Sequence, residues 1–388
     1  MSRILLLCAE LGSVGGVERL IATLAPILSQ EHEVQVASFD PAGTLPGVPL
    51  SVPFYPVGKE RSRSALLRPL TYLSQVRRLR RLERTLKIDV TISNLWRADL
   101  ISALVGGHPR RIALAHINIV GNHTNRLMLR FRPLVAYVYR RFDRIVAVSS
   151  ALGRELTDLY RLDPSKVRTI WNPVVKLKPV SSPSRFQRIV WCGRMVREKN
   201  VPALVKAFAA VRLRFPDAVL DLVGDGPERS AIEATAALHD LKIGQRGSNA
   251  SVIFHGRLAD PAPVISEASV LALPSIAEGF GLVLVEALGL GIPVVAADCA
   301  SGGVHEVLGA RTPHDPLRCK NEELACGWLL PVPLDDDSVR CWATTLEMML
   351  SDTRPQTLWR DGALARAEEF IPKRIGVQWA TLLADVIR

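Results

Sequence analysis

Two carboxylates stand among glycines and uncharged side chains in the C-terminal half of the chain. Glu278 and Glu286 lie within PSIAEGFGLVLVEALGLGIPVVAADCASGG, with seven residues between them. A carboxylate is costly to bury without a partner, so each must reach solvent, find a cation or be held ready for a ligand rich in hydroxyl groups. The stretch could therefore be a ligand site or an ordinary buried helix with exposed glutamates.

The place where the helix starts decides what this pair could do. If the segment is helical throughout, the two side chains point about 80° apart around the helix axis. If the helix begins only after Gly281, Glu278 lies on the glycine loop and Glu286 projects from the second turn. Glycines then let the backbone approach a ligand, and the unpaired amides of the first turn favour an anion. This second arrangement suits a phosphorylated sugar, and the residues alone leave both open.

The length and composition are those of a soluble globular protein. The 388 residues suffice for two domains of ordinary size or one large one, and 48% of them are hydrophobic and 22% charged. No apolar run reaches the roughly 18 to 20 residues that span a bilayer, and the start MSRILLLCAELG does not resemble a signal peptide. We therefore expect a cytoplasmic protein.

The cysteines show no metal-ligand or disulfide pattern. Because they are dispersed, without a Cys-x-x-Cys pair or a His/Cys cluster, we expect small core residues in a reducing compartment. They are Cys8, Cys192, Cys299, Cys319, Cys326 and Cys341.

The net charge of +11 is concentrated in the N-terminal half. Residues 1–170 contain 25 Lys and Arg against 13 Asp and Glu. The basic residues are densest in 59–87 and 126–144, where Arg alternates with Leu, Phe, Tyr and Val. This pattern suits a surface that rests on anionic lipid, and a solvated basic face is the alternative. No helix-turn-helix signal or aromatic platform strand is present, so we expect no nucleic-acid partner.

Short apolar runs alternate with helical patterns in both halves of the chain. This alternation predicts an α/β fold with parallel, doubly wound sheets. The runs are 4–9, 32–39, 90–95, 110–117 and 144–150 in the first half and 188–194, 218–226, 252–257, 269–275 and 293–298 in the second. A Pro- and Ser-rich break at 171–186 predicts a linker between two domains.

Ligands of such sheets bind outside the carboxyl ends of the strands. Four loops at these ends carry glycine, charge or both: GSVGG (12–16), GRMVREKN (193–200), GDGPER (224–229) and AEGFG (277–281). We expect them to face a cleft between the two domains.

Taken in this order, the motifs resemble the retaining glycosyltransferases of family 4, which have the GT-B fold. The glutamate pair is their most specific element, and the separate GR…EK segment strengthens the resemblance, which extends over essentially the whole chain. It implies two Rossmann-like domains that face each other across a cleft. Residues 1–172 would bind the acceptor, 173–370 would bind the nucleotide-sugar donor, and a helix in 371–388 would cross back to the N-terminal domain.

The resemblance also implies roles for individual donor-site residues. Glu286 would hold the ribose hydroxyls and Glu278 would face the donor sugar. Arg194 and Lys199 would stabilise the charge that develops on the leaving diphosphate. The backbone amides that would approach the sugar and the distal phosphate belong to Phe280, Gly281 and Leu282.

The N-terminal half supplies further candidates in the same family pattern. Gly15 and Gly16 fit the glycine loop against the donor phosphate, although a glycine turn occurs in any doubly wound domain. Glu18, on the following helix, is expected to be exposed. His116 would lie beside the donor sugar, where a neutral imidazole could bond a hydroxyl or relay a proton, and a structural role is the alternative.

No cofactor or metal is expected. Asp335, Asp336 and Asp337 form an acidic cluster, but they directly precede a helical pattern, where aspartates cap free amides and favour the helix dipole. The family resemblance implies metal-independent transfer, with protein cations in place of the metal.

The activity implied is transfer of a hexose or N-acetylhexosamine, with retention, from a nucleotide diphosphate sugar, most often a UDP-sugar. DCASGGVHEVL is similar to relatives that extend polyprenyl-diphosphate-linked sugars in bacterial surface polysaccharide or glycan assembly, except that Gly303 stands where proline is usual. The acceptor would then be lipid-linked or an oligosaccharide, and the enzyme peripheral on the inner face of the cytoplasmic membrane. A UDP-sugar epimerase and a non-catalytic nucleotide-sugar binder are the alternatives.

Overall fold

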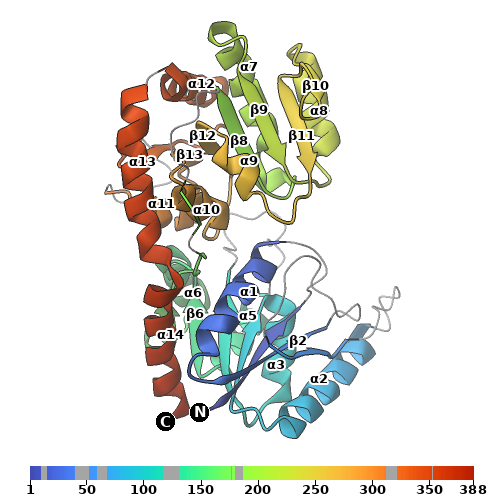
Figure 1. Cartoon of the computed structure of the whole chain (residues 1–388). Helices are drawn as coiled ribbons and strands as arrows, with labels where there is room; N and C mark the ends of the chain where they lie inside the picture. The colour runs from blue at the N-terminus through green and yellow to red at the C-terminus, as the bar shows by residue number, and fades with distance from the viewer. Residues whose placement is uncertain are drawn as a thin grey trace. The chain divides into compact units, whose positions relative to one another are not determined.

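The chain forms two compact units, each built around its own β-sheet (Figure 1). The computed structural model describes residues 1–9, 15–39, 52–58, 68–116, 131–175, 177–179, 187–311, 321–351 and 353–388. Unit 1 contains the described residues of Met1–Ile119, Asn125–Val175 and Ile371–Arg388. Unit 2 contains those of Lys176–Phe370.

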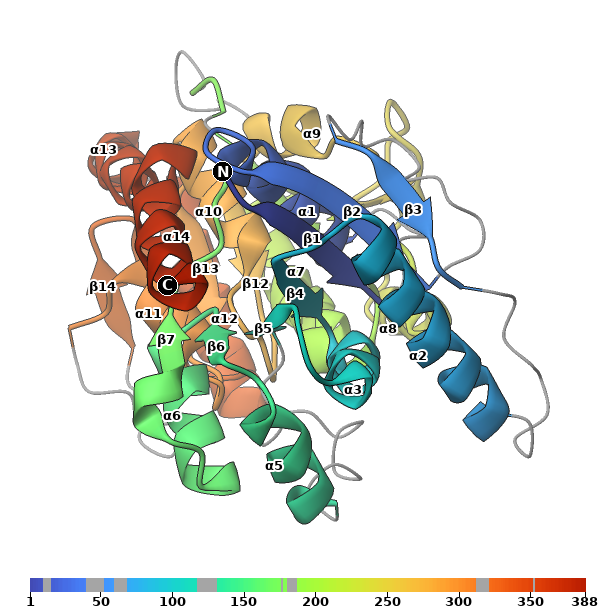
Figure 2. The same cartoon turned by 90° about the horizontal axis from the view of Figure 1, so that it is seen from below.

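Unit 1 has a seven-stranded, parallel sheet in the order β3-β2-β1-β4-β5-β6-β7, and Figure 2 shows its strands side by side. The strands are β1 (Arg3–Cys8), β2 (Glu33–Ser38), β3 (Phe54–Pro56), β4 (Val90–Asn94), β5 (Arg110–Ala115), β6 (Arg144–Ala147) and β7 (Val167–Thr169). The helices are α1 (Gly16–Leu28), α2 (Arg68–Thr85), α3 (Trp96–Val105), α5 (Arg132–Arg140), α6 (Ser150–Tyr160) and α14 (Pro372–Ile387), with a 3-10 turn at Pro164–Lys166.

Unit 2 has an eight-stranded sheet in the order β10-β11-β9-β8-β12-β13-β15-β14, in which only the edge strand β14 is antiparallel. The strands are β8 (Arg188–Cys192), β9 (Val219–Val223), β10 (Ile243–Gly244), β11 (Val252–Gly256), β12 (Val270–Leu273), β13 (Val294–Ala297), β14 (Glu322–Leu324) and β15 (Gly327–Leu330). The helices are α7 (Val201–Arg214), α8 (Arg229–Leu238), α9 (Ala262–Ser266), α10 (Leu282–Leu290), α11 (Gly303–Leu308), α12 (Asp336–Ser351) and α13 (Thr353–Ala367), with 3-10 turns at Arg197–Lys199 and Glu368–Phe370.

The predicted α/β class and the parallel pairing of the predicted strands are confirmed. Each of the ten predicted apolar runs contains a strand, because strands covered on both faces are rich in Val, Ile and Leu. Five strands were not predicted: β3, β7, β10, β14 and β15. They have two to four residues and lie at or next to a sheet edge, where short length leaves no hydrophobic pattern to detect.

The last helix, α14, packs within unit 1 against α1. Its buried face carries Ile375, Trp379, Leu382, Leu383 and Val386. A Cβ atom at Gly376 would lie 3.0 Å from Cγ2 of Ile27 on α1, so the small residue permits this close approach. The chain therefore returns to its N-terminal unit after completing unit 2.

The prediction for the cysteines is only partly correct. Cys8, Cys299 and Cys326 are buried, as expected of core residues, whereas Cys192 and Cys341 are partly exposed. Cys319 lies outside the described residues. Burial raises the pKa of Cys299 and Cys326 to about 11, so both are neutral thiols at neutral pH.

Candidate functional site

The glutamate pair lies at the carboxyl edge of the unit 2 sheet, on the connection from β12 to α10. Gly281 has φ of 83° and caps α10, which begins at Leu282. Because this left-handed conformation favours glycine, the helix cannot extend back through the loop. Glu278 therefore lies on the loop and Glu286 in the second turn, which confirms the second of the two arrangements considered from the sequence.

Glu278 forms an ion pair with Lys199, a residue far away in the sequence. The two side chains are only 15% and 21% exposed, so water and salt screen their attraction less than that of a surface pair. The 3-10 turn that carries Lys199 is joined to the loop a second time, because Ile276 N–H donates to the carbonyl of Glu198 at 2.8 Å. Two of the predicted site residues are thus held together.

The backbone of Glu278 is fixed by the segment that begins α11. Its N–H donates to Ser301 Oγ at 3.0 Å, and the Ser301 hydroxyl donates to its carbonyl at 2.6 Å. At Gly303 a Cβ atom would lie 2.1 Å from the carbonyl oxygen of Gly279, a distance no side chain tolerates. The close approach of the two backbones accounts for glycine at 303, where the family pattern has proline.

The start of α10 offers backbone donors. In the part of the chain that the structure describes, the N–H groups of Phe280, Gly281 and Leu282 have no hydrogen-bond acceptor. The Phe280 side chain is 3% exposed and packs edge-on against Phe370, with ring centroids 5.7 Å apart. It anchors the loop, so only its backbone can contact a ligand. Free amides at a helix start favour an anion.

A third loop positions Arg194, whose guanidinium is exposed and has no ion pair or hydrogen bond among the described residues. The loop lies on the backbone of GDGPER. A Cβ atom at Gly224, which has φ of 132°, would be 1.8 Å from the carbonyl oxygen of Gly193, and one at Gly226 would be 2.3 Å from that of Met195. Two glycines therefore let the backbones touch and set the position of Arg194.

In unit 1 the candidate residues lie at the carboxyl edge of the other sheet. Gly15 caps α1 and Gly16 is its first residue. The expectation that Glu18 is exposed was wrong, since it is 8% exposed. A Cβ atom at Gly15 would lie 2.7 Å from Oε2 of Glu18, so the carboxylate folds back onto the glycine turn. Residues 12–14 of the predicted loop lie outside the described residues.

His116 directly follows β5, and its Nε2 lies 3.0 Å from Oδ1 of Asn94, the last residue of the neighbouring strand β4. An amide oxygen only accepts, so Nε2 carries the proton and Nδ1 keeps a lone pair. Burial lowers the pKa of His116 to about 4, which keeps the ring neutral at pH 7. Asn94 was not predicted, although its place at the end of the adjacent strand is the signal that could have revealed it.

The predicted residues thus form two groups, one in each unit. Unit 2 joins Glu278 to Lys199 and holds the three amides, Glu286 and Arg194 on loops and a helix of the same sheet edge. Unit 1 has Gly15, Gly16 and His116 beyond the ends of β1 and β5, which flank β4.

The acidic cluster caps a helix, as predicted. Asp335 Oδ1 accepts from the Ser338 hydroxyl at 2.6 Å and from the N–H of Ser338 at 2.8 Å, and these two bonds, the hydroxyl's first, lower the pKa of Asp335. Asp336 and Asp337 follow in the first turn of α12, and Asp337 pairs with Arg340. The described residues include no group of three or more His, Cys, Asp or Glu arranged to hold a metal.

Comparison with known proteins identifies the class. The solved structure of Anabaena Alr3699/HepE in complex with UDP and glucose matches this fold with a TM-score of 0.78, covering 99% of this chain and 100% of that one at 19% identity. The fold is therefore GT-B, as predicted. Residues 14–175 match the model described as Glycosyltransferase Family 4, and residues 186–325 match Glycosyl transferases group 1. The chain belongs to the group 1, family 4 type of glycosyltransferases.

Two relatives from Campylobacter jejuni are similar over nearly their whole length. One, an N-acetylgalactosamine-N,N'-diacetylbacillosaminyl-diphospho-undecaprenol 4-alpha-N-acetylgalactosaminyltransferase, is 25% identical and covers 93% of both chains. The other, a GalNAc-alpha-(1->4)-GalNAc-alpha-(1->3)-diNAcBac-PP-undecaprenol alpha-1,4-N-acetyl-D-galactosaminyltransferase, is 24% identical over 100% of this chain and 99% of its own.

Neutral His116 should make folding sensitive to acid. Its pKa rises from about 4 in the folded chain to about 6.5 on unfolding, so the unfolded state binds the extra proton. Stability from this group is complete above about pH 6.5 and is lost as the pH falls toward 4. We expect His116→Gln to reduce the loss of unfolding free energy between pH 7.5 and 4.5 by about 2 kcal/mol in urea titrations.

Asn94→Ala is the control, because it removes the bond to the ring but leaves the imidazole in place. Since burial is the cause of the low pKa, this variant should keep the acid-dependent loss. Equal acid dependence in His116→Gln and the unmodified chain would show that the ring is not held neutral.

Proposed function

We propose that this enzyme transfers a hexose or N-acetylhexosamine from a UDP-sugar to a polyprenyl-diphosphate-linked sugar, in the assembly of a bacterial surface polysaccharide or glycan. The observation that carries the proposal is the Glu278 loop, where a carboxylate paired with Lys199 lies close before three amides that have no acceptor among the described residues. The solved relative with UDP and glucose supports the donor class, and the undecaprenyl-linked acceptors in the names of the Campylobacter relatives support the acceptor class.

The donor would be held by groups that suit its separate parts. Glu286 accepts hydrogen bonds from the ribose hydroxyls. The amides at the start of α10 face the sugar and the distal phosphate. Arg194 and Lys199 lie on the diphosphate and stabilise the negative charge that develops as the glycosidic bond breaks. These cations would do the work of a metal, so we propose transfer without a metal or cofactor.

Glu278 and His116 would act on the donor sugar itself. Glu278 has two acceptor oxygens, and Lys199 holds its carboxylate while leaving room for a sugar hydroxyl. His116 is neutral, and the bond from Nε2 to Asn94 leaves Nδ1 to accept a proton. Gly15 and Gly16 would let the backbone approach the phosphate from the N-terminal unit.

We infer that the transfer retains the anomeric configuration. The leaving diphosphate would depart from the face that the acceptor attacks, through an oxocarbenium-like state, and its oxygen would take the acceptor proton. Double displacement requires a carboxylate nucleophile beside the anomeric carbon. The site motif supplies Glu278 for sugar hydroxyls and Glu286 for ribose, and no third carboxylate.

Two other functions use the same donor residues. A UDP-sugar epimerase would form product without any acceptor, and a non-catalytic binder would hold the nucleotide sugar without turnover. The match to transferase models across both units and the acceptors of the named relatives favour transfer.

We further propose that unit 1 rests on the anionic inner face of the cytoplasmic membrane. No helix among the described residues is long and apolar enough to cross a bilayer. The start of α5, however, exposes Phe131, Leu134 and Tyr137, which are 50%, 47% and 50% exposed. Their spacing of three residues places them on one face. Arg132, Arg140 and Arg141 are also exposed there, and the Arg141 guanidinium stacks on Tyr137.

This combination is typical of interfacial binding, since apolar side chains enter the head-group region while arginines contact lipid phosphates. The opposite side of α5, with Val135, Val138 and Tyr139, is buried in the unit. Residues 59–67 and 126–130 of the two predicted basic segments lie outside the described residues.

Variants that lose UDP binding and variants that lose transfer activity test the proposed donor site. In EDTA, UDP at about 100 times its dissociation constant should stabilise the protein by roughly 2.7 kcal/mol. Glu278→Gln should lower kcat about a hundredfold with little change in UDP affinity, whereas Arg194→Gln should weaken UDP about tenfold. Glu267→Gln, at a partly exposed residue that pairs with Arg246 before the amino end of β12, should change neither. Stabilisation by GDP instead of UDP would show that the donor carries guanosine and not uridine. Full activity of Glu278→Gln would show that Glu278 has no part in transfer.

The configuration of the product tests retention. Nuclear magnetic resonance of the new linkage formed from an α-linked donor should show an α anomer. An inverted linkage would exclude same-face departure of the diphosphate.

Vesicle binding tests the membrane surface. Phe131→Ser/Leu134→Ser should weaken binding to phosphatidylglycerol vesicles at low salt about tenfold, because it removes two apolar side chains from the interface. Leu213→Ser/Leu238→Ser changes two residues of unit 2 that are 88% and 78% exposed and serves as the matched control. Equal binding by both variants would exclude α5 as the contact.

A further inference from the structure

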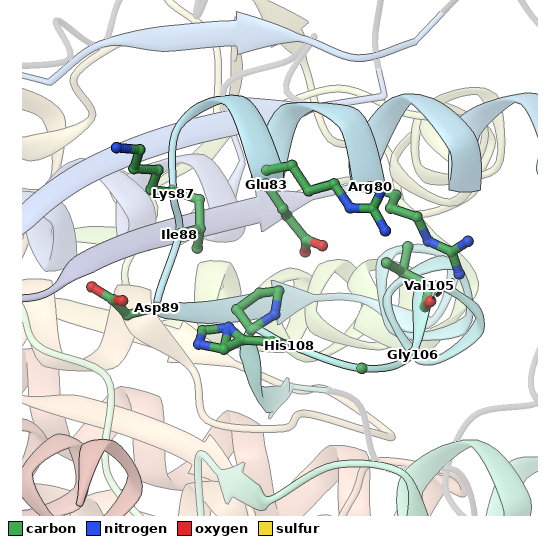
Figure 3. Close-up of a pocket in the computed structure, with 11 residues that line it drawn as sticks. Arg80, Glu83, Lys87, Ile88, Asp89, Val105, Gly106 and His108 are labelled. Carbon is green, nitrogen blue, oxygen red and sulfur yellow. Dashed lines mark hydrogen bonds between the residues drawn. The ribbon is translucent and has the colours of Figure 1, made fainter.

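Unit 1 has a cavity of about 790 Å³ at the end of α2 (Figure 3). It lies beside the residues that enter β4 and β5, at the amino edge of the sheet. Asn94 and His116 lie at the opposite, carboxyl ends of these strands, so the cavity is not part of the proposed catalytic site. It is lined by Arg80, Glu83, Arg84, Lys87, Ile88, Asp89, Val105, Gly106, Gly107, His108 and Pro109.

The two carboxylates of the lining have partners of different kinds. Glu83 is buried and accepts from both terminal nitrogens of Arg111, at 3.0 and 3.1 Å, and from the Thr91 hydroxyl at 2.8 Å. Asp89 Oδ2 accepts from the N–H of Arg3 at 2.7 Å. Arg111 therefore offsets the charge of Glu83, whereas Asp89 leaves one negative charge against the three cations Arg80, Arg84 and Lys87 of the lining.

The cations are exposed and largely unpaired. Arg80 donates to the carbonyl of Val105 and is held at the wall. The side chains of Arg84 and Lys87 have no ion pair or hydrogen bond among the residues that the structure describes. Three cations outnumber the one carboxylate of the lining that has no cationic partner, and an anion would relieve their repulsion.

The loop between α3 and β5 leaves the cavity open. Gly106 and Gly107 have φ of 61° and 70°, and a Cβ atom built at either would meet no atom within 4 Å. Such a Cβ atom would project into open space, so the wall there is bare backbone. The volume lies within the range of small-molecule sites, which is roughly 300 to 1,000 Å³.

We propose that this cavity binds a phosphate-bearing anion. Arg84 and Arg80 present guanidinium groups, whose planar donors match phosphate oxygens in pairs, and Lys87 adds a point charge. A diphosphate group matches the charge of these cations. The phosphate belongs either to a free soluble diphosphate or to a lipid head group, because both present the same oxygens.

Exposed positive charge continues beyond the cavity along α2. Arg77, Arg81 and Arg84 are spaced four and three residues apart, lie on one helix face and are exposed. A positive stripe that ends in a cavity draws an anion toward it and raises its local concentration.

Calorimetric titration with inorganic pyrophosphate tests the cavity. Arg84→Gln/Lys87→Gln should weaken this site tenfold or more, because each cation makes charge-assisted hydrogen bonds. Arg154→Gln/Arg168→Gln removes the same charge from exposed positions outside the lining and should leave binding unchanged. Since the changed side chains are exposed, all variants should keep the unfolding midpoint of the unmodified chain.

The donor site is distinguished by its own variant. Binding of pyrophosphate at the donor site should be lost in Arg194→Gln and retained in Arg84→Gln/Lys87→Gln. Binding in the cavity should be retained in Arg194→Gln and lost in Arg84→Gln/Lys87→Gln. Equal affinity and stoichiometry in the cavity variant and its charge control would overturn the proposal, whatever becomes of the donor site.

Vesicles identify the source of the phosphate. If the cavity variant also loses binding to phosphatidylglycerol vesicles beyond the loss in the Arg154→Gln/Arg168→Gln control, the ligand is a lipid head group. If only pyrophosphate binding falls, the ligand is a soluble anion. Both results support an anion site.

Discussion

The carboxylate loop depends on a contact between two backbones. The carbonyl of Gly279 lies so close to Gly303 that a side chain at 303 would displace the loop. Beside this contact Ser301 bonds the backbone of Glu278, and the left-handed turn at Gly281 starts α10 at Leu282. Because the helix starts at Leu282, the amides of Phe280, Gly281 and Leu282 have no acceptor among the described residues. Close packing of the loop and the capping glycine together position the carboxylate and the donors beside it.

The two cations of this site differ in freedom, and the difference suits their proposed roles. Lys199 is shielded and tied to Glu278, whereas Arg194 is exposed, on a loop set by Gly224 and Gly226. A ligand diphosphate would have to share Lys199 with the carboxylate but would meet Arg194 without competition. The shared lysine therefore lies between the proposed phosphate position and the residue that faces the sugar, whereas Arg194 serves the phosphate alone.

The long strands and the carboxylate loop could be predicted from the sequence because each is determined by neighbouring residues. Apolar runs mark strands buried on both faces, and Gly281 marks the helix start. Contacts between segments that are distant in the sequence have no local pattern that predicts them. The pairing of Lys199 with Glu278, the bond from His116 to Asn94 and the burial of Glu18 arise only when strands and loops assemble. The cavity beside α2 could not be predicted for the same reason. The sequence shows that its arginines are charged, but not that α2 and the loop before β5 enclose a cavity.

The two edges of the unit 1 sheet differ in the charge of the side chains described there. At the carboxyl edge burial keeps His116 neutral and an amide orients it, so the ring adds no positive charge there at pH 7. At the amino edge Arg84 and Lys87 remain charged and unpaired by any described side chain. Arg84 and Lys87 therefore lie at the edge of the sheet opposite Asn94 and His116. A substitution in this cavity should leave the surroundings of His116 intact.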